Sequence, residues 1–137
     1  MKKPLWIVLL FAIAAAYDGV LGFGFLAAPD YPFKVFHVTP PNHMGYVQFP
    51  AALLLIFALM FVAIAIDPAK NRNLIIYGIL LKVAYCGVTL AHWLTTDIPD
   101  MWKPFTIVDL VMGLLFIWAY AALSSATSSA SERPITT

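Results

Sequence analysis

Four apolar stretches constrain the fold of this chain more than any other feature of its sequence. They cover approximately residues 5–27, 47–66, 74–94 and 105–123. A helix needs about 20 residues, each rising about 1.5 Å, to cross a hydrocarbon core of roughly 30 Å. Backbone groups in lipid must be hydrogen-bonded internally, and continuous apolar runs lack the alternation of a membrane β-strand. The sequence therefore predicts an all-α fold, a bundle of four transmembrane helices.

Prolines stand at or near the limits of these stretches. Pro4 and Pro104 lie where the first turn of a helix tolerates proline, and Pro50 is placed in the first turn of the second span. Pro29 and Pro68 follow the ends of the first and second spans. We therefore expect residues 1–123 to form one transmembrane domain and residues 124–137 a polar, disordered C-terminal tail.

Composition agrees with a protein solvated by lipid. The chain is 62% apolar and 11% charged, whereas soluble domains are near 45–50% apolar and about 25% charged. Its formal net charge of +1 provides no basic field for nucleic acid. The single cysteine, Cys86, excludes an internal disulfide and a cysteine-based metal site. We expect Cys86 to pack as a small apolar residue.

Loop charges predict the orientation, because Lys and Arg accumulate on the cytoplasmic side. With both termini cytoplasmic, the inner positions are Lys2, Lys3, Lys70, Arg72 and Arg133, and the outer positions are Lys34 and Lys103. The first span resembles a signal peptide as far as Ala16, but its apolar run continues to Ala28, so we expect it to stay uncleaved. The expected location is a bacterial inner membrane.

The loop between the first two spans is rich in proline and aromatic residues. Aromatic rings prefer the headgroup level, so residues 31–38 are predicted to form a short interfacial turn of helix. This segment could act as a lid over a cavity or only as an anchor at the membrane interface. We favour the interfacial anchor. His37 and His43 lie in this loop, and His92 lies near the outer end of the third span. These three histidines form a candidate outer-face ligand site, although their spacing matches no metal motif.

Three charged residues fall inside the spans, at a cost of about 2.5–3.5 kcal/mol each near a helix centre. They are Asp18, Lys82 and Asp109. At roughly 1.5 Å per residue, Asp18 and Asp109 lie about 3 Å and 7 Å outside the midplane and Lys82 about 3 Å inside it. A lysine stem spans such a gap, so we predict an Asp18, Lys82, Asp109 cluster in the bundle interior. Tyr85 and Gln48 are expected to complete its hydrogen bonds.

This intramembrane polar cluster has three interpretations. It could specify helix packing, bind a ligand, or couple to protons or ions. We favour packing, because intramembrane polar groups commonly join helices. The sequence contains no cofactor motif, no metal motif and no GxSxG serine, and it leaves room for a bound lipid, quinone or pigment.

Several segments resemble a group of small, uncharacterised bacterial four-helix membrane proteins. The likeness covers about residues 17–120 and includes the segments YDGVLGFGFLAAPDYPFKVF, TPPN and DPAKNRNLIIYGILLK. Its matching positions are Tyr17, Gly22, Pro29, Pro41, Gln48, Asp67, Pro68, Lys82 and Asp109. In size and layout the chain is also distantly similar to DoxX-like membrane proteins. The resemblance implies the four-helix fold and no particular activity.

Three functions therefore remain open. The first is a non-catalytic accessory or assembly subunit of a membrane complex, redox or photosynthetic, that contacts other subunits or a second copy of itself. The second is a small transporter or a binder of a lipid- or quinone-type ligand that uses the polar cluster. The third is an enzyme with Lys82, Tyr85 or His92 as acid or base, which the lack of catalytic motifs disfavours.

Overall fold

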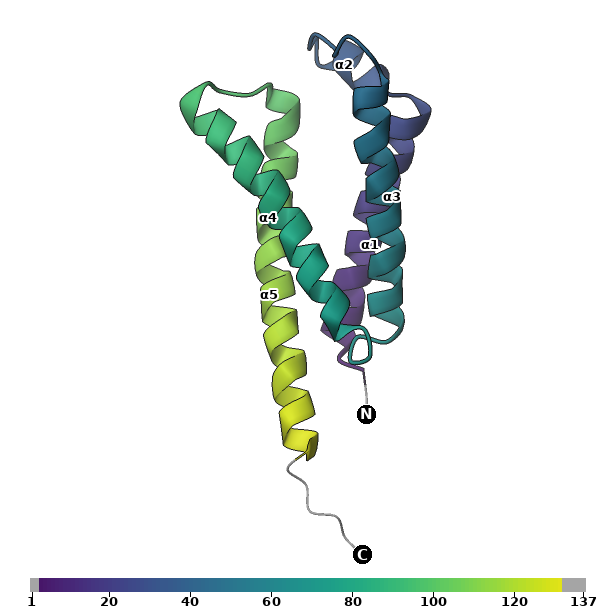
Figure 1. The fold of residues 1–137 in the computed structure, drawn as a ribbon, viewed down its shortest axis with the longest axis vertical. Coiled ribbons are helices and arrows are strands. Elements are labelled where there is room, and N and C mark those ends of the chain that lie inside the picture. Colours follow the sequence, from purple (N-terminus) through teal and green to yellow (C-terminus); the bar gives the residue numbers. More distant parts are fainter. Residues whose placement is uncertain (1–2, 132–137) are drawn as a thin grey trace, which may run out of the picture.

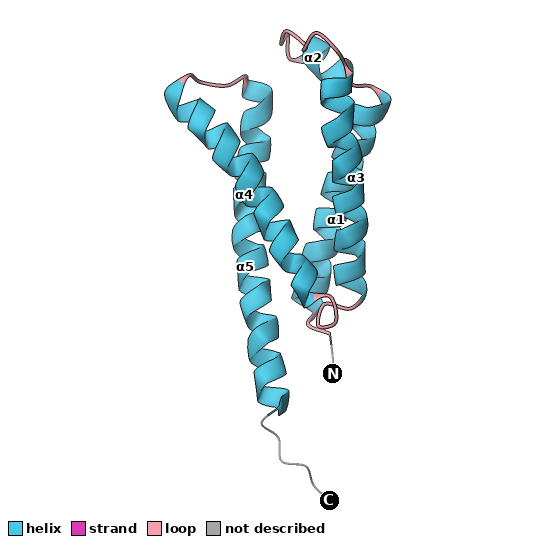
Figure 2. Cartoon of the chain, viewed as in Figure 1, coloured by secondary structure: helices cyan, strands magenta, loops and turns pink. Residues whose placement is uncertain are grey.

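The computed structural model describes residues 3–131 of the chain, with side chains through Ser124. Within this range the elements are helices joined by loops, as Figure 2 shows. In chain order they are α1 (Leu5–Ala27), α2 (Tyr31–Val35), α3 (Gly45–Ile66), α4 (Arg72–Thr95), the short 3₁₀ helix η1 (Asp100–Trp102) and α5 (Lys103–Ser131). Four of these described segments, α1, α3, α4 and η1 with α5, are long and apolar enough to cross a membrane. The four predicted spans are confirmed, and they indicate a multi-pass membrane protein.

Helices α3, α4 and α5 each begin two residues before the predicted span, and α4 and α5 end later than predicted. Helix α3 begins at Gly45, so Pro50 lies in its second turn rather than its first. The earlier start is stabilised by His43, whose Nδ1 accepts a hydrogen bond from the Gly45 N–H at 2.9 Å. Helix α5 continues through Ser131, eight residues beyond the predicted limit at Leu123. Alanines recur in this polar extension, and alanine has the highest helix propensity. The rest of the predicted tail, residues 132–137, lies outside the described residues.

The helices form two hairpins. Helix α1 packs along α3, and α4 packs along α5. Figure 1 shows the two hairpins close together near the start of α1 and spread apart toward α2. We call the end that carries α2 and the α4–α5 connection the wide end, and the end that carries the α3–α4 connection the narrow end. The expected bundle is thus a pair of hairpins that diverge.

Aromatic packing joins the hairpins in their narrower half. The rings of Phe11, Phe61 and Phe116, which come from α1, α3 and α5, are fully buried and lie 4.7–5.9 Å apart between centroids. Helix α4 meets them at Gly78, where an added Cβ would lie 2.8 Å from Phe61 Cε1. All four long helices therefore meet around three phenylalanine rings, and glycine at position 78 permits the close approach.

Glycine also sets the distance within the first hairpin. A Cβ added to Gly22 of α1 would lie 2.8 Å from the Ala51 carbonyl oxygen of α3. No heavy atom lies within 4 Å of a Cβ built on Gly24, two residues further along α1. Gly22 therefore faces α3 at backbone contact, whereas the Gly24 position is open. Small residues allow such close approach between membrane helices.

Candidate functional site

A buried ion cluster connects the two hairpins through three helices. Lys82 of α4 places Nζ 3.3 Å from Asp18 Oδ1 of α1 and 3.0 Å from Asp109 Oδ1 of α5. The three residues are 1%, 2% and 7% exposed for Asp18, Lys82 and Asp109. Gly113 of α5 makes room for the lysine stem, since a Cβ there would lie 3.2 Å from Lys82 Cβ. The predicted cluster is thus present in the structure, with one ammonium in contact with both carboxylates.

The two residues expected to complete the cluster bond elsewhere. Gln48 Nε2 donates to the Leu26 carbonyl oxygen at 3.2 Å. Leu26 lies eight residues, or about 12 Å, beyond Asp18 along α1, so Gln48 is too far along the bundle to reach the ions. The Tyr85 hydroxyl donates to the Trp102 carbonyl oxygen at 3.3 Å. Placing both residues in the cluster's hydrogen-bond network was therefore wrong.

The cluster leaves two buried polar atoms without a partner. Among the described side chains these atoms are Asp18 Oδ2 and the Tyr17 hydroxyl oxygen. The Tyr17 ring is close to the cation, with its centroid 5.4 Å from Lys82 Nζ. A buried polar atom without a partner costs about 1–3 kcal/mol, and more when the group is charged. The site therefore has unused hydrogen-bonding capacity on α1.

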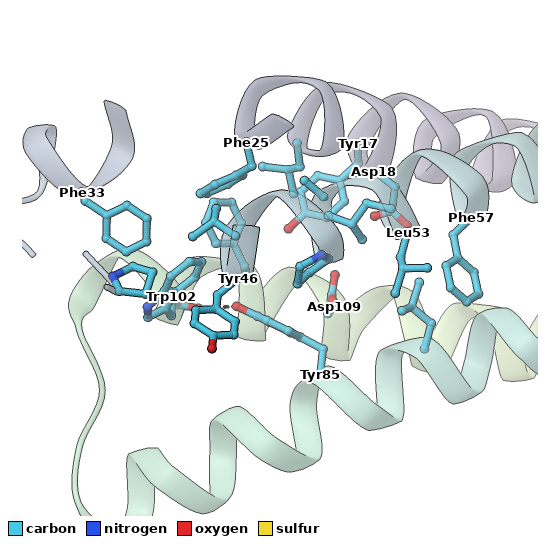
Figure 3. Close-up of a pocket in the computed structure, with 18 residues that line it drawn as sticks. Tyr17, Asp18, Phe25, Phe33, Tyr46, Leu53, Phe57, Tyr85, Trp102 and Asp109 are labelled. Carbon is cyan, nitrogen blue, oxygen red and sulfur yellow. Dashed lines mark hydrogen bonds between the residues drawn. The ribbon is translucent and has the colours of Figure 1, made fainter. Parts of the chain in front are cut away.

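A cavity of about 510 Å³ lies between the hairpins toward the wide end. Asp18 and Asp109 line it together with largely apolar side chains from both hairpins, as Figure 3 shows. Its eight aromatic lining residues are Tyr17, Phe25, Phe33, Tyr46, Phe57, Tyr85, Trp102 and Phe105. Ligand sites have similar volumes, about 300–1,000 Å³, and a similar mix of apolar walls and a few polar groups. The cavity thus connects the ion cluster with an aromatic chamber.

Aromatic contacts around Trp102 join the two hairpins beside the cavity. The Trp102 ring stacks on Phe25 of α1 at 6.0 Å and meets Phe33 of α2 edge-on at 6.2 Å. Phe33 is buried, and its ring lines the chamber in Figure 3. The helix predicted over residues 31–38 is present as the shorter α2, with one ring turned into the cavity. One ring of α2 thus contributes to the cavity wall, and the lid and interfacial-anchor interpretations of α2 both stay predictions.

The polar face of α4 beyond the cluster packs against α5. Cys86 Sγ lies 3.5 Å from the Thr106 carbonyl oxygen, and Thr89 Oγ1 lies 3.0 Å from Thr106 Oγ1. Cys86 is free and buried. These contacts lie within the second hairpin, so they explain Cys86 and Thr89 as residues that pack α4 against α5. The predicted packing role of Cys86 is in accord with them.

The three candidate histidines take separate local roles. His43 supports the start of α3, and its ring meets Tyr46 edge-on at 6.4 Å. His37 follows α2 with a φ of 53°, and His92 lies in the last turn of α4. Within the part of the chain that the structure describes, no three His, Cys, Asp or Glu residues group so that they could hold a metal ion. The structure therefore does not support the histidines as a metal site.

Comparison with known proteins adds no assignment: the chain matches no protein-family model, no curated protein and no solved structure. The resemblance to small bacterial four-helix proteins and to DoxX-like proteins stays a prediction.

Two residues of the site, Tyr17 and Trp102, were not predicted from the sequence. Tyr17 lies next to Asp18 in the sequence, so helical spacing does not place it on the same face. The available signal was that Tyr17 is one of the positions at which the chain resembles the small bacterial four-helix proteins. Trp102 lies in a loop in the predicted topology, and no periodic pattern reaches it. Its role depends on how far α4 and α5 tilt away from α1, which the sequence pattern does not encode.

Proposed function

We propose that this protein binds a small amphiphile from the membrane in the cavity between its hairpins. The observation that carries the proposal is that Asp18, whose buried Oδ2 has no hydrogen-bond partner, lines a largely apolar cavity of about 510 Å³. A ligand group that donates a hydrogen bond to this oxygen would offset the cost of its burial. The aromatic walls would contact the apolar part of the same molecule.

The direction of the chain in the membrane is part of this proposal. We infer that both termini are cytoplasmic in a bacterial inner membrane, because the terminal segments and the α3–α4 connection carry more Lys and Arg residues in the sequence than the other two connections. The cavity would then lie toward the outer leaflet. A small transporter would use the same site.

An accessory subunit remains a second proposal, and a pair of exposed apolar rings is its candidate contact surface. Trp6 and Trp118 are 41% and 65% exposed and contact each other at 5.3 Å between centroids. Lipid would cover this pair as well as a protein would, so it favours no partner over the bilayer. Release of only free monomers from native membranes by a mild detergent would count against assembly.

The binding proposal can be tested with a brominated probe, because bromine quenches tryptophan fluorescence on close contact. The protein in phosphatidylcholine nanodiscs is titrated with ω-bromododecanol, and a saturable quenching component is expected from Trp102. The variant Trp102→Phe should lose this component. Unsaturable quenching from exposed tryptophans in the bilayer, with no difference between the two proteins, would reject the proposal.

A matched pair of substitutions separates the cavity from the lipid-facing surface. Leu54→Phe adds bulk to a residue that lines the cavity, and Leu59→Phe makes the same change at a position that is 71% exposed. We expect Leu54→Phe to weaken the saturable quenching and Leu59→Phe to leave it as it is. Equal effects of the two variants would place the probe outside the cavity.

A further inference from the structure

The charges around the cavity define the class of head group that it would accept. With all three groups ionised, two carboxylates and one ammonium give a formal charge of −2 + 1 = −1. The residues that line the cavity include Asp18 and Asp109 but no Lys, Arg or His. Lys82 already donates to one oxygen of each carboxylate. A molecule in the cavity therefore faces the negative side of the cluster.

The unpartnered oxygen adds a specific contact to this field. An ionised carboxylate accepts hydrogen bonds and donates none. Asp18 Oδ2 is buried, and it lies on a residue that lines the cavity. A hydrogen bond between an ionised donor and a carboxylate is about twice as strong as one between neutral groups. An ammonium would thus supply both the missing donor and the missing positive charge.

The aromatic walls provide an independent reason to expect a cation. A positive group within about 6 Å of a ring centroid is attracted by the negative face of the ring. Lys82 Nζ already lies 5.4 Å from the Tyr17 ring and 5.9 Å from the Phe61 ring. Tyr17 and further rings continue along the cavity wall, with Phe105 at 6.4 Å from Tyr17 between centroids. The chamber can therefore stabilise a second cation beside the cluster.

From these observations we infer that the cavity accepts a lipophilic amine in its ammonium form, with its N–H group on Asp18 Oδ2 and its apolar part among the aromatic rings. This inference rests on the proposed binding function and names the ligand class for that site. Anionic amphiphiles are disfavoured, because their head group would meet two carboxylates. Neutral amphiphiles such as alcohols and quinols can donate to Asp18 but leave the excess negative charge in place.

The test compares three probes that differ only in their head group. The unmodified protein in phosphatidylcholine nanodiscs is titrated with ω-bromododecylamine, ω-bromododecanol and ω-bromododecanoic acid, with each concentration expressed per lipid. We expect half-saturation of the Trp102 quenching at a concentration about tenfold or more lower for the amine than for the alcohol, and weakest binding by the acid. Equal binding of the amine and the alcohol would overturn the inference while leaving the proposed function intact. Absence of saturable quenching by all three would reject both.

Substitutions assign the preference to the cluster. Asp18→Asn should remove most of the difference between amine and alcohol, because it removes the charged acceptor. Asp67→Asn makes the same chemical change in the α3–α4 connection at the narrow end and should preserve the difference. An amine preference that survives Asp18→Asn would overturn the contact with Asp18. If that variant does not fold, the probe series on the unmodified protein still decides the head-group class.

Discussion

Replacement of Lys82 by methionine tests whether the buried cluster holds the hairpins together. Methionine keeps the unbranched length of the stem and removes the ammonium, which lies 3.3 Å from Asp18 and 3.0 Å from Asp109. Two carboxylates at 1% and 7% exposure then remain without their cation. Removing one partner of a buried ion pair typically costs about 3–5 kcal/mol, because the remaining charge stays buried. We expect Lys82→Met to lower the free energy of unfolding by about this amount.

The assay is equilibrium unfolding in mixed micelles with increasing dodecyl sulfate, followed by far-ultraviolet circular dichroism. The control is the triple variant Asp18→Asn, Lys82→Met, Asp109→Asn, in which no charge remains in the cluster. Replacement of a whole buried ion cluster by well-packed apolar residues is often close to neutral in stability, and asparagine here removes each negative charge at nearly unchanged side-chain volume. We therefore expect the triple variant to be more stable than Lys82→Met alone. A single variant as stable as the unmodified protein, or a triple variant no better than the single one, would refute this account.

The other predictions concern glycines at helix contacts, each measured by the same unfolding assay. Gly22→Ala should destabilise by about 1–3 kcal/mol, because the new methyl group would meet a backbone oxygen of α3 at 2.8 Å. Gly24→Ala is open and should be neutral or stabilising by up to about 1 kcal/mol; equal effects at the two positions would contradict the hairpin packing. Gly78→Ala should destabilise through its contact with Phe61, whereas Gly87→Ala on the same helix has no neighbour within 4 Å and should not. A harmless Gly78→Ala would show that α4 does not approach the phenylalanine rings as closely as the structure has it.

Much of the fold followed from the sequence, because the bilayer restricts what an apolar run can do. The four long helices are predicted by the length of the apolar runs and by the need of every backbone N–H and C=O group in lipid to be hydrogen-bonded within its own segment. The ion cluster was also predictable, since depth depends only on the position of a residue along its span. The depths calculated from these positions place Asp18 and Asp109 within reach of the Lys82 side chain.

The angle between the hairpins was not predictable in the same way. It depends on where small residues let backbones approach, and glycine fits a tight contact or an open surface equally well. Gly22 faces α3 closely, while Gly24 faces open space. Without this angle, the sequence could not predict the cavity or the contact of Trp102 with Phe25. It also could not predict that Gln48 bonds outside the cluster. Each depends on distances between helices rather than on position within one.

The four long helices meet around Gly78, so a rotation of one hairpin against the other about this point would move nearby residues least. Tyr85 lies seven residues, or about 10 Å, from Gly78 along α4, and the end of the helix at Thr95 lies about 25 Å from it. A rigid rotation of the second hairpin about this point would move Thr95 about two and a half times as far as Tyr85. With such a rotation, a sub-ångström change in packing at the phenylalanine rings would become a larger displacement at the wide end. Lys82, only about 6 Å from Gly78, would keep its carboxylates within reach while the chamber above it changes width.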